Sequence, residues 1–303
     1  MKMRSASLNY RDSLIVNGYY NPDLVLPFVP LSDGVGSVVS VGQNVTRVKL
    51  GDRVAGTFVQ NWLSGEAPEN FVTLGADMGG VLAQYVVLHQ DGVVRVPEHL
   101  TDEEAATLPC AAVTAWSALM EQGTLRPGQT VLVQGTGGVS LFALQFARMA
   151  GARVIVISSN DEKLQRARSL GAAEGINYKQ TPEWDKQALE LTDGTGVDHV
   201  VEVGGAGTLS RSLNAVRKGG QISLIGILSG ISTELALLPI LMKQIRVQGI
   251  FVGSRTAFEK MNDAISLNKL KPVVDRVFSF EESSAAIRYM PQGTHVGKIA
   301  IRF

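Results

Sequence analysis

The chain has 303 residues, 45% of them hydrophobic and 18% charged, a composition typical of a globular protein with two domains. Lysine plus arginine equals aspartate plus glutamate at 28 each, so there is no basic excess to bind nucleic acid or an anionic membrane surface. A single cysteine excludes an internal disulfide and, with four scattered histidines, leaves little from which to build a zinc site. We therefore expect a cytoplasmic protein without a signal peptide or a membrane-spanning segment.

Short β-branched runs alternate with glycine turns between residues 33 and 96. This pattern is typical of an antiparallel, partly closed β domain. The predicted strands are Gly36–Gly42, Gly51–Gly56 and Leu82–Leu88. A long loop, Thr57–Val81, separates the last two, and loops of this length are usually functional or mobile. Trp62 in this loop either covers a substrate or anchors the loop.

From about Thr101 onward, short apolar strands alternate with helical segments. Such alternation predicts a parallel sheet with helices on both faces. The predicted strands are Thr130–Gln134, Arg153–Ile157, His199–Val203, Gln221–Ile225 and Arg246–Phe251. The tail, Lys271–Phe303, returns to strand character, and we expect it to rejoin the first domain. Its predicted strands are Val273–Phe280 and Lys298–Phe303.

The strand that ends at Gln134 leads through a glycine turn directly into an apolar helix, Leu141–Ala150. A strand, a glycine turn and a buried helix direct backbone N–H groups and the positive helix end at one point, where a diphosphate can bind. The turn residues are Gly135, Gly137, Gly138 and Val139. Ser140 stands where the dinucleotide-binding fingerprint has its third glycine. We therefore predict a dinucleotide site here.

The residues after the second strand favour NADP(H) over NAD(H). Ser158 occupies its last position, where NAD-selective proteins place a carboxylate for the ribose 2′-hydroxyl. Ser158 and Ser159 can donate hydrogen bonds to a 2′-phosphate, and Lys163 can reach back toward it. The alternative is that these residues have only structural roles. Ser159 and Glu162 would then form a capping box for the helix Asp161–Leu170, and the side chain of Lys163 would be exposed to solvent.

Four segments together resemble the medium-chain dehydrogenase/reductase superfamily, in its zinc-free, quinone-oxidoreductase-like branch. They are Leu8–Asp12 (Leu-Asn-Tyr-Arg-Asp), Gly51–Val54, the glycine turn and Gly249–Arg255. The resemblance covers essentially the whole chain, which is N-terminally short relative to this branch. It implies an α/β protein with a GroES-like, mostly β catalytic domain, residues 1–100 and 270–303. The inserted residues 101–269 would form a Rossmann domain with a doubly wound parallel sheet.

The resemblance also bears on metal binding. In the zinc-dependent alcohol dehydrogenases of this superfamily, a Cys, a His-Glu pair and a second Cys surround the catalytic metal. The aligned positions hold Asn9, Ser32 with Asp33, and Cys110. A single thiol cannot hold zinc, and the four cysteines of the structural-zinc lobe are also absent from the sequence. We therefore expect a protein without zinc.

The same resemblance assigns the cofactor contacts. It implies that Ser158, Ser159, Lys163 and Tyr178 contact the adenosine and its 2′-phosphate. It places Thr114 beside the nicotinamide, within walls formed by Gly204, Ile225, Ile250, Phe251 and Val252. Relatives often dimerise through the edge of the Rossmann sheet, so a homodimer is also an expectation, although no other feature of the sequence points to it.

A metal-free site must stabilise the negative charge on a substrate oxygen with hydrogen-bond donors. Quinones and α,β-unsaturated carbonyls delocalise that charge, so we expect these substrates rather than simple alcohols. The candidate donors are the Asn9 amide and the hydroxyls of Tyr10 and Thr114, and Tyr10 can deliver the final proton. The local alternatives are a packed aromatic at Tyr10, beside Asp12, and a turn or strand-end hydrogen bond at Asn9.

The sequence thus predicts a zinc-independent, NADPH-dependent oxidoreductase. Two alternatives remain open. One is alcohol or aldehyde oxidoreduction at the same site, and the other is a protein that binds NADPH without catalysis.

Overall fold

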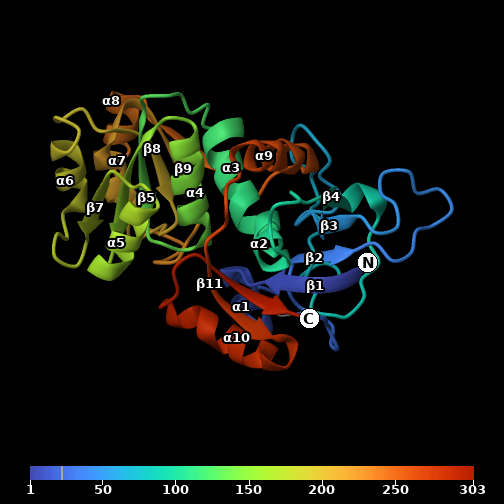
Figure 1. The fold of residues 1–303 in the computed structure, drawn as a ribbon. Helices are drawn as coiled ribbons and strands as arrows, with labels where there is room; N and C mark the ends of the chain where they lie inside the picture. Colours follow the sequence, from blue (N-terminus) through green and yellow to red (C-terminus); the bar gives the residue numbers. More distant parts are fainter. Residues whose placement is uncertain (22) are drawn as a thin grey trace. The chain divides into compact units, whose positions relative to one another are not determined.

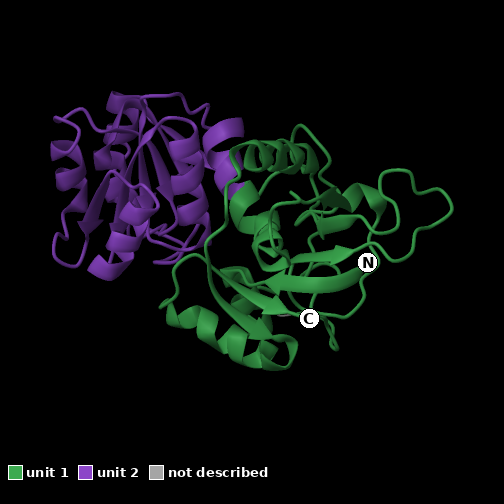
Figure 2. Ribbon diagram, in the orientation of Figure 1, with its two compact units in different colours: residues 1–113, 252–303 green, residues 114–251 purple. Residues whose placement is uncertain are grey.

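The computed structural model describes residues 1–21 and 23–303. The chain forms two compact units, unit 1 with residues 1–113 and 252–303 and unit 2 with residues 114–251 (Figure 2). Among the described residues, none of the helices combines the length and apolar character needed to cross a membrane. The predicted α/β fold class is confirmed, and the following paragraphs describe each unit by itself.

Unit 1 is built on a mixed six-stranded sheet in the order β11-β12-β1-β2-β3-β4 (Figure 1). Its strands are β1 (Lys2–Ser7), β2 (Asp33–Ser37), β3 (Arg53–Gly56), β4 (Val93–Arg95), β11 (Val274–Ser279) and β12 (Lys298–Arg302). Its helices are α1 (Tyr10–Val16), α2 (Asp102–Ala106), α9 (Arg255–Asn268) and α10 (Ser283–Tyr289). Single 3₁₀ or π turns lie at Gln90–Gly92, Leu108–Ala112, Phe280–Glu282 and Met290–Gln292. The C-terminal tail therefore pairs with the start of the chain, since β12 runs antiparallel to β1.

Two strand predictions in unit 1 need correction. The segment Leu82–Leu88 is not a regular strand, because its pairing with the start of the chain is limited to an isolated bridge between Lys2 and Tyr85 and a few backbone hydrogen bonds. Val87 is 92% exposed, whereas Leu82, Val86 and Leu88 are partly buried and pack against a core cluster of unit 1. The strand that pairs with β3 is instead β4, and the predicted strand Gly36–Gly42 overlaps β2 only at Gly36 and Ser37. Strands β2, β3 and β4 pair antiparallel, as predicted for residues 33–96, whereas β11 and β12 in the tail run parallel.

Unit 2 contains a six-stranded sheet in the order β10-β9-β8-β5-β6-β7, with every pair parallel. Its strands are β5 (Thr130–Gln134), β6 (Arg153–Ser158), β7 (Glu174–Asn177), β8 (Val197–Glu202), β9 (Val216–Leu224) and β10 (Arg246–Gly249). Its helices are α4 (Gly138–Met149), α5 (Asp161–Ser169), α6 (Trp184–Glu190), α7 (Leu209–Ala215) and α8 (Leu238–Lys243), with a π turn at Ser117–Glu121. Helix α3 (Val113–Trp116) spans the limit between the units. This is the predicted doubly wound sheet.

Apolar packing explains why these segments adopt the fold. Strands β5, β6 and β8 are almost wholly buried, as expected for central strands of a parallel sheet covered on both faces. One core cluster packs Trp184 of α6 and Leu213 of α7 against sheet residues such as Leu132. Helix α4 is buried on most of its surface, and its Phe142 and Phe146 rings stack with centroids 5.9 Å apart. The central strands and their covering helices thus form a rigid base for the turns at the strand ends.

The limits of the compact units lie at residues 113/114 and 251/252. Helix α2 contacts β1 and β2, and α9 contacts β4, so both helices belong to unit 1. From the sequence we expected the catalytic and Rossmann domains to meet at residues 100/101 and 269/270. These limits of the functional domains stay a prediction.

Candidate functional site

The glycine turn after β5 has the geometry of a phosphate-binding turn. Gly135 adopts φ +73°, a conformation that favours glycine, and its N–H donates to the carbonyl of Ile157 at 2.7 Å. A Cβ atom added at Gly135 or Gly137 would meet no heavy atom within 4 Å, so the space above the turn is open. Helix α4 begins at once, and its first N–H groups need an external acceptor. A diphosphate fits this open turn.

Ser140 replaces the third glycine of the fingerprint without cost to packing. Its hydroxyl is buried and donates to the backbone carbonyl of Gln134 at 2.6 Å. This hydrogen bond ties the first turn of α4 to the end of β5, the same close contact that a glycine provides in the fingerprint.

The predicted nicotinamide neighbours collect at the carboxyl edge of the same sheet. Strand β5 lies between β8 and β6, which is the point where the direction of winding reverses. Gly204 follows β8, Ile225 follows β9 and Ile250 follows β10. The N–H of Ile225 donates to Glu202 O and that of Ile250 to Leu224 O, both at 2.9 Å, which fixes these strand ends side by side. Parallel topology therefore brings together residues that are far apart in sequence.

Glu202, at the end of β8, is a residue for which the sequence indicated no function beyond the strand end. Its carboxylate is completely buried and accepts five hydrogen bonds at 2.5–3.0 Å. The donors are Gln134 Nε2, Ser212 Oγ, Thr208 Oγ1 and the backbone N–H groups of Gly204 and Gly205. The side-chain oxygen of Gln134 in turn accepts from the N–H groups of Val203 and Gly204. This network, Gln134 with Glu202, fixes the glycine turn to the loop after β8.

The structure corrects one interpretation at the adenosine end. Ser159 does not cap α5, because the cap is Asn160, whose Oδ1 accepts from the N–H groups of Glu162 at 2.8 Å and Lys163 at 3.1 Å. Asn160 is extended and directly precedes the helix, so its short side chain reaches both groups. Ser159 therefore has no role as the helix cap.

The nearest acidic residue at this end is engaged elsewhere. Asp161 accepts from Asn177 Nδ2 at 2.7 Å and from Gln180 Nε2 at 2.8 Å. These residues flank Tyr178, whose ring is 41% exposed and whose N–H donates to Ser158 O at 3.0 Å. Ser158 and Tyr178 are thus brought together, with Asp161 held against the Tyr178 segment.

The other predicted residues divide between the units. Thr114 is buried in α3 and Phe251 is 41% exposed, both in unit 2. Val252 lies in unit 1, with φ +46°, and packs with Phe58 and Val59. Asn9 and Tyr10 begin α1 in unit 1, where Asn9 is 8% exposed and Tyr10 46% exposed. The partly exposed Tyr10 ring is not packed in the core.

Trp62 anchors its loop. Its indole N–H donates to Gly65 O at 3.1 Å, and its ring lies 6.0 Å from that of Phe71, centroid to centroid. Its backbone carbonyl also accepts from the N–H of Arg255 at 2.9 Å. Of the two roles that the sequence left open, the structure supports the anchor.

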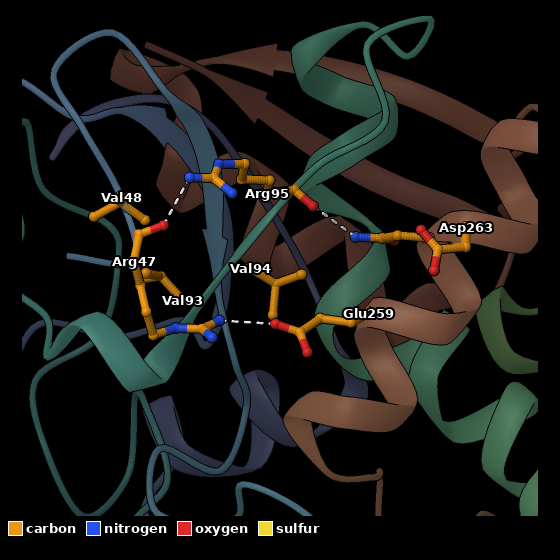
Figure 3. A pocket seen from close by; sticks show the side chains of 8 residues that line it. Arg47, Val48, Val93, Val94, Arg95, Glu259 and Asp263 are labelled. Carbon is orange, nitrogen blue, oxygen red and sulfur yellow. Dashed lines mark hydrogen bonds and ion pairs between the residues drawn. The ribbon is translucent and has the colours of Figure 1, made fainter.

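A pocket of about 180 Å³ lies elsewhere in unit 1, between β4 and α9 (Figure 3). Arg47 closes one side through an ion pair with Glu259 at 2.7 Å, and Asn262 Nδ2 donates to Arg95 O at 2.9 Å. Its lining contains none of the residues predicted for the cofactor or the chemistry. Arg47 and Glu259 pair with each other and Arg95 pairs with Asp52, so we do not assign the cofactor or the substrate to the pocket.

The residues aligned with the zinc ligands form a buried polar cluster in unit 1. Ser32 Oγ donates to Asp33 Oδ1 at 2.7 Å, and the N–H of Cys110 donates to Asp33 Oδ2 at 3.1 Å. Lys298, the first residue of β12, donates through Nζ to Asn9 Oδ1 at 2.6 Å and lies 3.9 Å from Asp33 Oδ2. Burial raises the pKa of Asp33, and the Lys298 ammonium opposes this shift.

Asp12 lies beside this cluster and is completely buried. Its Oδ2 accepts from the N–H of Asn9 at 2.7 Å, whereas its Oδ1 has no hydrogen-bond partner among the described residues. Burial raises the pKa of Asp12 from 3.8 to about 6, against the opposing effect of the neighbouring Arg11 guanidinium.

We expect Asp12→Asn to flatten the pH dependence of unfolding. Because the folded pKa lies above the unfolded value, the native chain binds the proton more tightly, and the free energy of unfolding falls as pH rises from about 4 to about 6. The amide keeps an acceptor for Asn9 but cannot titrate, so the variant loses this slope, worth about 3 kcal/mol. Urea unfolding of both proteins across this pH range measures the difference. Parallel curves would contradict the raised pKa.

Unit 2 has an open glycine turn at the switch point of a parallel sheet, and unit 1 carries a buried polar cluster. These two features define the class of dinucleotide-dependent oxidoreductases. The family comparisons agree. Residues 1–98 match the alcohol dehydrogenase GroES-like domain, and residues 138–267 match the zinc-binding dehydrogenase domain. The chain belongs to the medium-chain dehydrogenase/reductase superfamily, as the sequence resemblance predicted.

The names of similar proteins also refer to alcohol dehydrogenases. A zinc-type alcohol dehydrogenase-like protein of Schizosaccharomyces pombe is 45% identical over 311 residues, covering 100% of this chain and 90% of that protein. A solved structure of a putative alcohol dehydrogenase from Sinorhizobium meliloti 1021 is 45% identical with a TM-score of 0.94, covering 100% of this chain and 89% of that one. A structure named NAD-dependent alcohol dehydrogenase is 32% identical with a TM-score of 0.91, covering 100% and 90%. The protein is therefore an oxidoreductase of this superfamily.

These names raise the question of zinc, and the donor set of this chain does not fit that ion. Zinc sites use thiolate, imidazole and carboxylate ligands, whereas the cluster offers an amide, a hydroxyl, one carboxylate and one thiol. Burial raises the pKa of Cys110 to about 12, so this thiol is protonated in the absence of a metal ion. Across residues 1–21 and 23–303, no group of three His, Cys, Asp or Glu residues could hold a metal ion. The Lys298 ammonium also places a positive charge among these residues.

Proposed function

We propose that this protein is a zinc-independent, NADPH-dependent oxidoreductase that reduces quinones or α,β-unsaturated carbonyls. The observation that carries the proposal is the cluster around Asn9. Where zinc-dependent relatives have metal ligands, this chain has an amide, a hydroxyl and a carboxylate bound to a buried ammonium. Such a cluster supplies hydrogen-bond donors rather than a Lewis acid, and this favours substrates that delocalise charge.

The cofactor would be held by unit 2. The glycine turn and the start of α4 bind the diphosphate, and the loops after β8, β9 and β10 border the nicotinamide. Ser158, Ser159, Lys163 and Tyr178 contact the adenosine and its 2′-phosphate in this proposal. When bound, NADPH supplies the hydride.

The chain's own residues handle the charge and the proton. The Asn9 amide and the Thr114 hydroxyl donate hydrogen bonds to the substrate oxygen as it gains negative charge. Tyr10, which is 46% exposed, can give up its phenolic proton and recover it from water. A conjugated carbonyl accepts the hydride at its β-carbon, and the resulting enolate takes this proton.

A substrate panel tests the proposal. The purified protein is mixed with NADPH or NADH and a set of enones, quinones and aldehydes, and with NADP⁺ or NAD⁺ and a set of alcohols, before and after treatment with a zinc chelator. We expect turnover of enones or quinones with NADPH at an unchanged rate after chelation. Stoichiometric zinc by elemental analysis, with activity that disappears on chelation, would overturn the metal-free mechanism.

Alcohol or aldehyde oxidoreduction at the same site is the second candidate. It is favoured by the names of the similar proteins, which are a zinc-type alcohol dehydrogenase-like protein, a putative alcohol dehydrogenase and an NAD-dependent alcohol dehydrogenase. Oxidation of a secondary alcohol by this protein, with every enone and quinone inert, would select it. Tight NADPH binding without turnover of any substrate in the panel would instead indicate a binding protein.

We also propose a homodimer that forms through unit 2. Strand β10 lies at the edge of its sheet, and the adjacent helix α8 has no buried residue. Leu238, Leu241 and Met242 of α8 are each about two-thirds exposed, and contiguous exposed apolar side chains often mark protein–protein interfaces. We place the protein in the cytoplasm, because its one cysteine suits a reducing compartment.

We expect Leu241→Glu to convert the dimer into a monomer, because a charge would be buried at the centre of this apolar surface. Light scattering coupled to size-exclusion chromatography measures the mass. Leu267→Glu is the matched control, since Leu267 is 84% exposed on α9 in unit 1. A wild-type protein that is monomeric at micromolar concentration, or a variant that stays dimeric, would contradict the proposal.

A further inference from the structure

The pocket of about 180 Å³ between β4 and α9 has no part in the proposed function, because its lining contains none of the residues assigned to the cofactor or the chemistry. Glu259, Asn262 and Asp263 line it from α9 (Figure 3). They share one face of the helix, since they are spaced by three and four positions. Apolar side chains complete much of the lining, namely Val48, Val93 and Val94. The pocket therefore combines polar groups of one helix with an apolar surface.

Asn262 carries a hydrogen-bond acceptor that the described part of the chain does not satisfy. The residue is 6% exposed, and its Oδ1 atom is buried without a hydrogen-bond partner among residues 1–21 and 23–303. Its Nδ2 atom donates to Arg95 O at 2.9 Å, so the amide cannot turn over without placing two oxygens against each other. A buried acceptor without a donor lowers stability, and a ligand that brings an N–H group would satisfy it.

The charges around the pocket leave one carboxylate without a partner. The arginines of this ion-pair network each have a carboxylate partner at 2.7–3.0 Å, in the pairs Arg47–Glu259, Arg95–Asp52 and Arg255–Asp91. Asp263 lines the pocket, and its carboxylate makes neither a hydrogen bond nor an ion pair with another described residue. The unpaired polar groups of the lining are thus the Asn262 oxygen and the Asp263 carboxylate, both acceptors, and one negative charge is in excess.

We propose that this pocket binds a small organic cation that has a primary ammonium group and a short alkyl chain. An ammonium has three N–H donors and no acceptor, so it matches both unpaired groups and the excess negative charge. The alkyl chain would pack against the valines of the lining, because apolar surface gains free energy on leaving water. An anionic ligand would instead meet the Asp263 carboxylate, while the arginines are already paired.

Ligand-detected NMR with probes of matched shape tests the proposal. The intact chain, in a phosphate buffer at neutral pH so that no amine buffer competes, is titrated with n-butylammonium, n-butanol, butyrate and tetramethylammonium. n-Butanol lacks the charge, butyrate reverses it, and tetramethylammonium keeps the charge but has no N–H donor. We expect saturation-transfer signals from n-butylammonium with a Kd on the order of 1 mM, and binding of the other three that is weaker by at least roughly 10-fold.

Variants of α9 locate the binding. Asp263→Asn removes the unpaired charge from an exposed helix position and should weaken n-butylammonium binding by about 10-fold. Asn262→Leu removes the buried acceptor and should abolish measurable binding. If that variant fails to fold, Asp263→Asn decides the question by itself. Glu281→Gln removes an exposed charge of unit 1 outside the lining and should bind the probe as the wild type does.

Four results would overturn the proposal. Equal binding of n-butanol and n-butylammonium would show that the pocket is only an apolar crevice. Equal affinity in Asp263→Asn and the wild type would place the cation elsewhere, and so would its displacement by saturating NADPH. Absence of n-butylammonium binding would leave water as the partner of Asn262.

Discussion

Replacing Glu202 with alanine should cause the largest loss of stability of any single change in unit 2. Its carboxylate accepts hydrogen bonds from two backbone N–H groups and three side chains, all within the buried end of the sheet. Removal of the acceptor leaves several buried donors unsatisfied, and loss of one partner from a buried charged network costs about 3–5 kcal/mol. We expect the midpoint of urea unfolding to fall accordingly, and NADPH binding to be lost at temperatures where the variant is partly unfolded.

The variant Glu202→Gln separates the effect of side-chain shape on stability from the effect of charge. The amide has nearly the same volume but places an NH₂ group against donors, so we expect a smaller loss of about 1–3 kcal/mol. Because the Gln134 side chain joins Glu202 to the end of β5, the Kd for NADPH should rise in this variant even where it is fully folded. Glu190→Gln, on the exposed side of α6, serves as the control. A Glu202→Ala protein as stable as the wild type would show that water replaces the carboxylate.

Ser158→Asp should reverse the cofactor preference from NADPH to NADH. Ser158 ends β6 next to Asn177 of β7, and the N–H of Tyr178 donates to its carbonyl. A carboxylate there would repel the 2′-phosphate and accept a hydrogen bond from the ribose hydroxyls of NADH. We expect the ratio of kcat/KM values, NADPH to NADH, to fall by roughly 100-fold, equivalent to about 2.7 kcal/mol.

The control adds the same charge to unit 2 at a distance from strand β6. Ser169→Asp lies at the exposed C-terminal end of α5 and should leave the ratio unchanged. An equal ratio in Ser158→Asp and the wild type would show that this position does not contact the 2′-phosphate. A wild-type preference for NADH, the cofactor class named for one of the similar structures, would overturn the cofactor proposal itself.

Much of the fold follows from local sequence. The glycine turn was recognisable because Gly135 must adopt positive φ and because the residues on either side read as strand and helix. The central strands β5 and β6 were predicted because each contains a continuous apolar run, and β8 was predicted from its paired valines Val200 and Val201. Strands β4 and β7 were not, since they are short and carry little periodic pattern. The segment Leu82–Leu88 has the right residues for a strand but few backbone partners.

The site is a different matter. The sequence predicted Asn9 as a substrate donor and the serines as cofactor contacts, and it showed an amide, a hydroxyl and a carboxylate at positions aligned with zinc ligands. It did not indicate Lys298 or Glu202, because a lone lysine in a strand and a glutamate at a strand end usually reach solvent. Only pairing of β12 with β1 brings Lys298 to Asn9, which lies 289 residues away in the chain.

What the sequence by itself determined is the identity of the groups: a turn that leaves room for a diphosphate, serines in place of a ribose-binding acid, and amide and hydroxyl side chains where a metal would need thiolate and imidazole. Those are properties of single residues and their immediate neighbours. What only the tertiary structure decided is orientation and charge balance, namely which face of the Asn9 amide points to Lys298 and which donors surround Glu202. Hydrogen bonds have direction, and the partners that set that direction come from strands far apart in the chain.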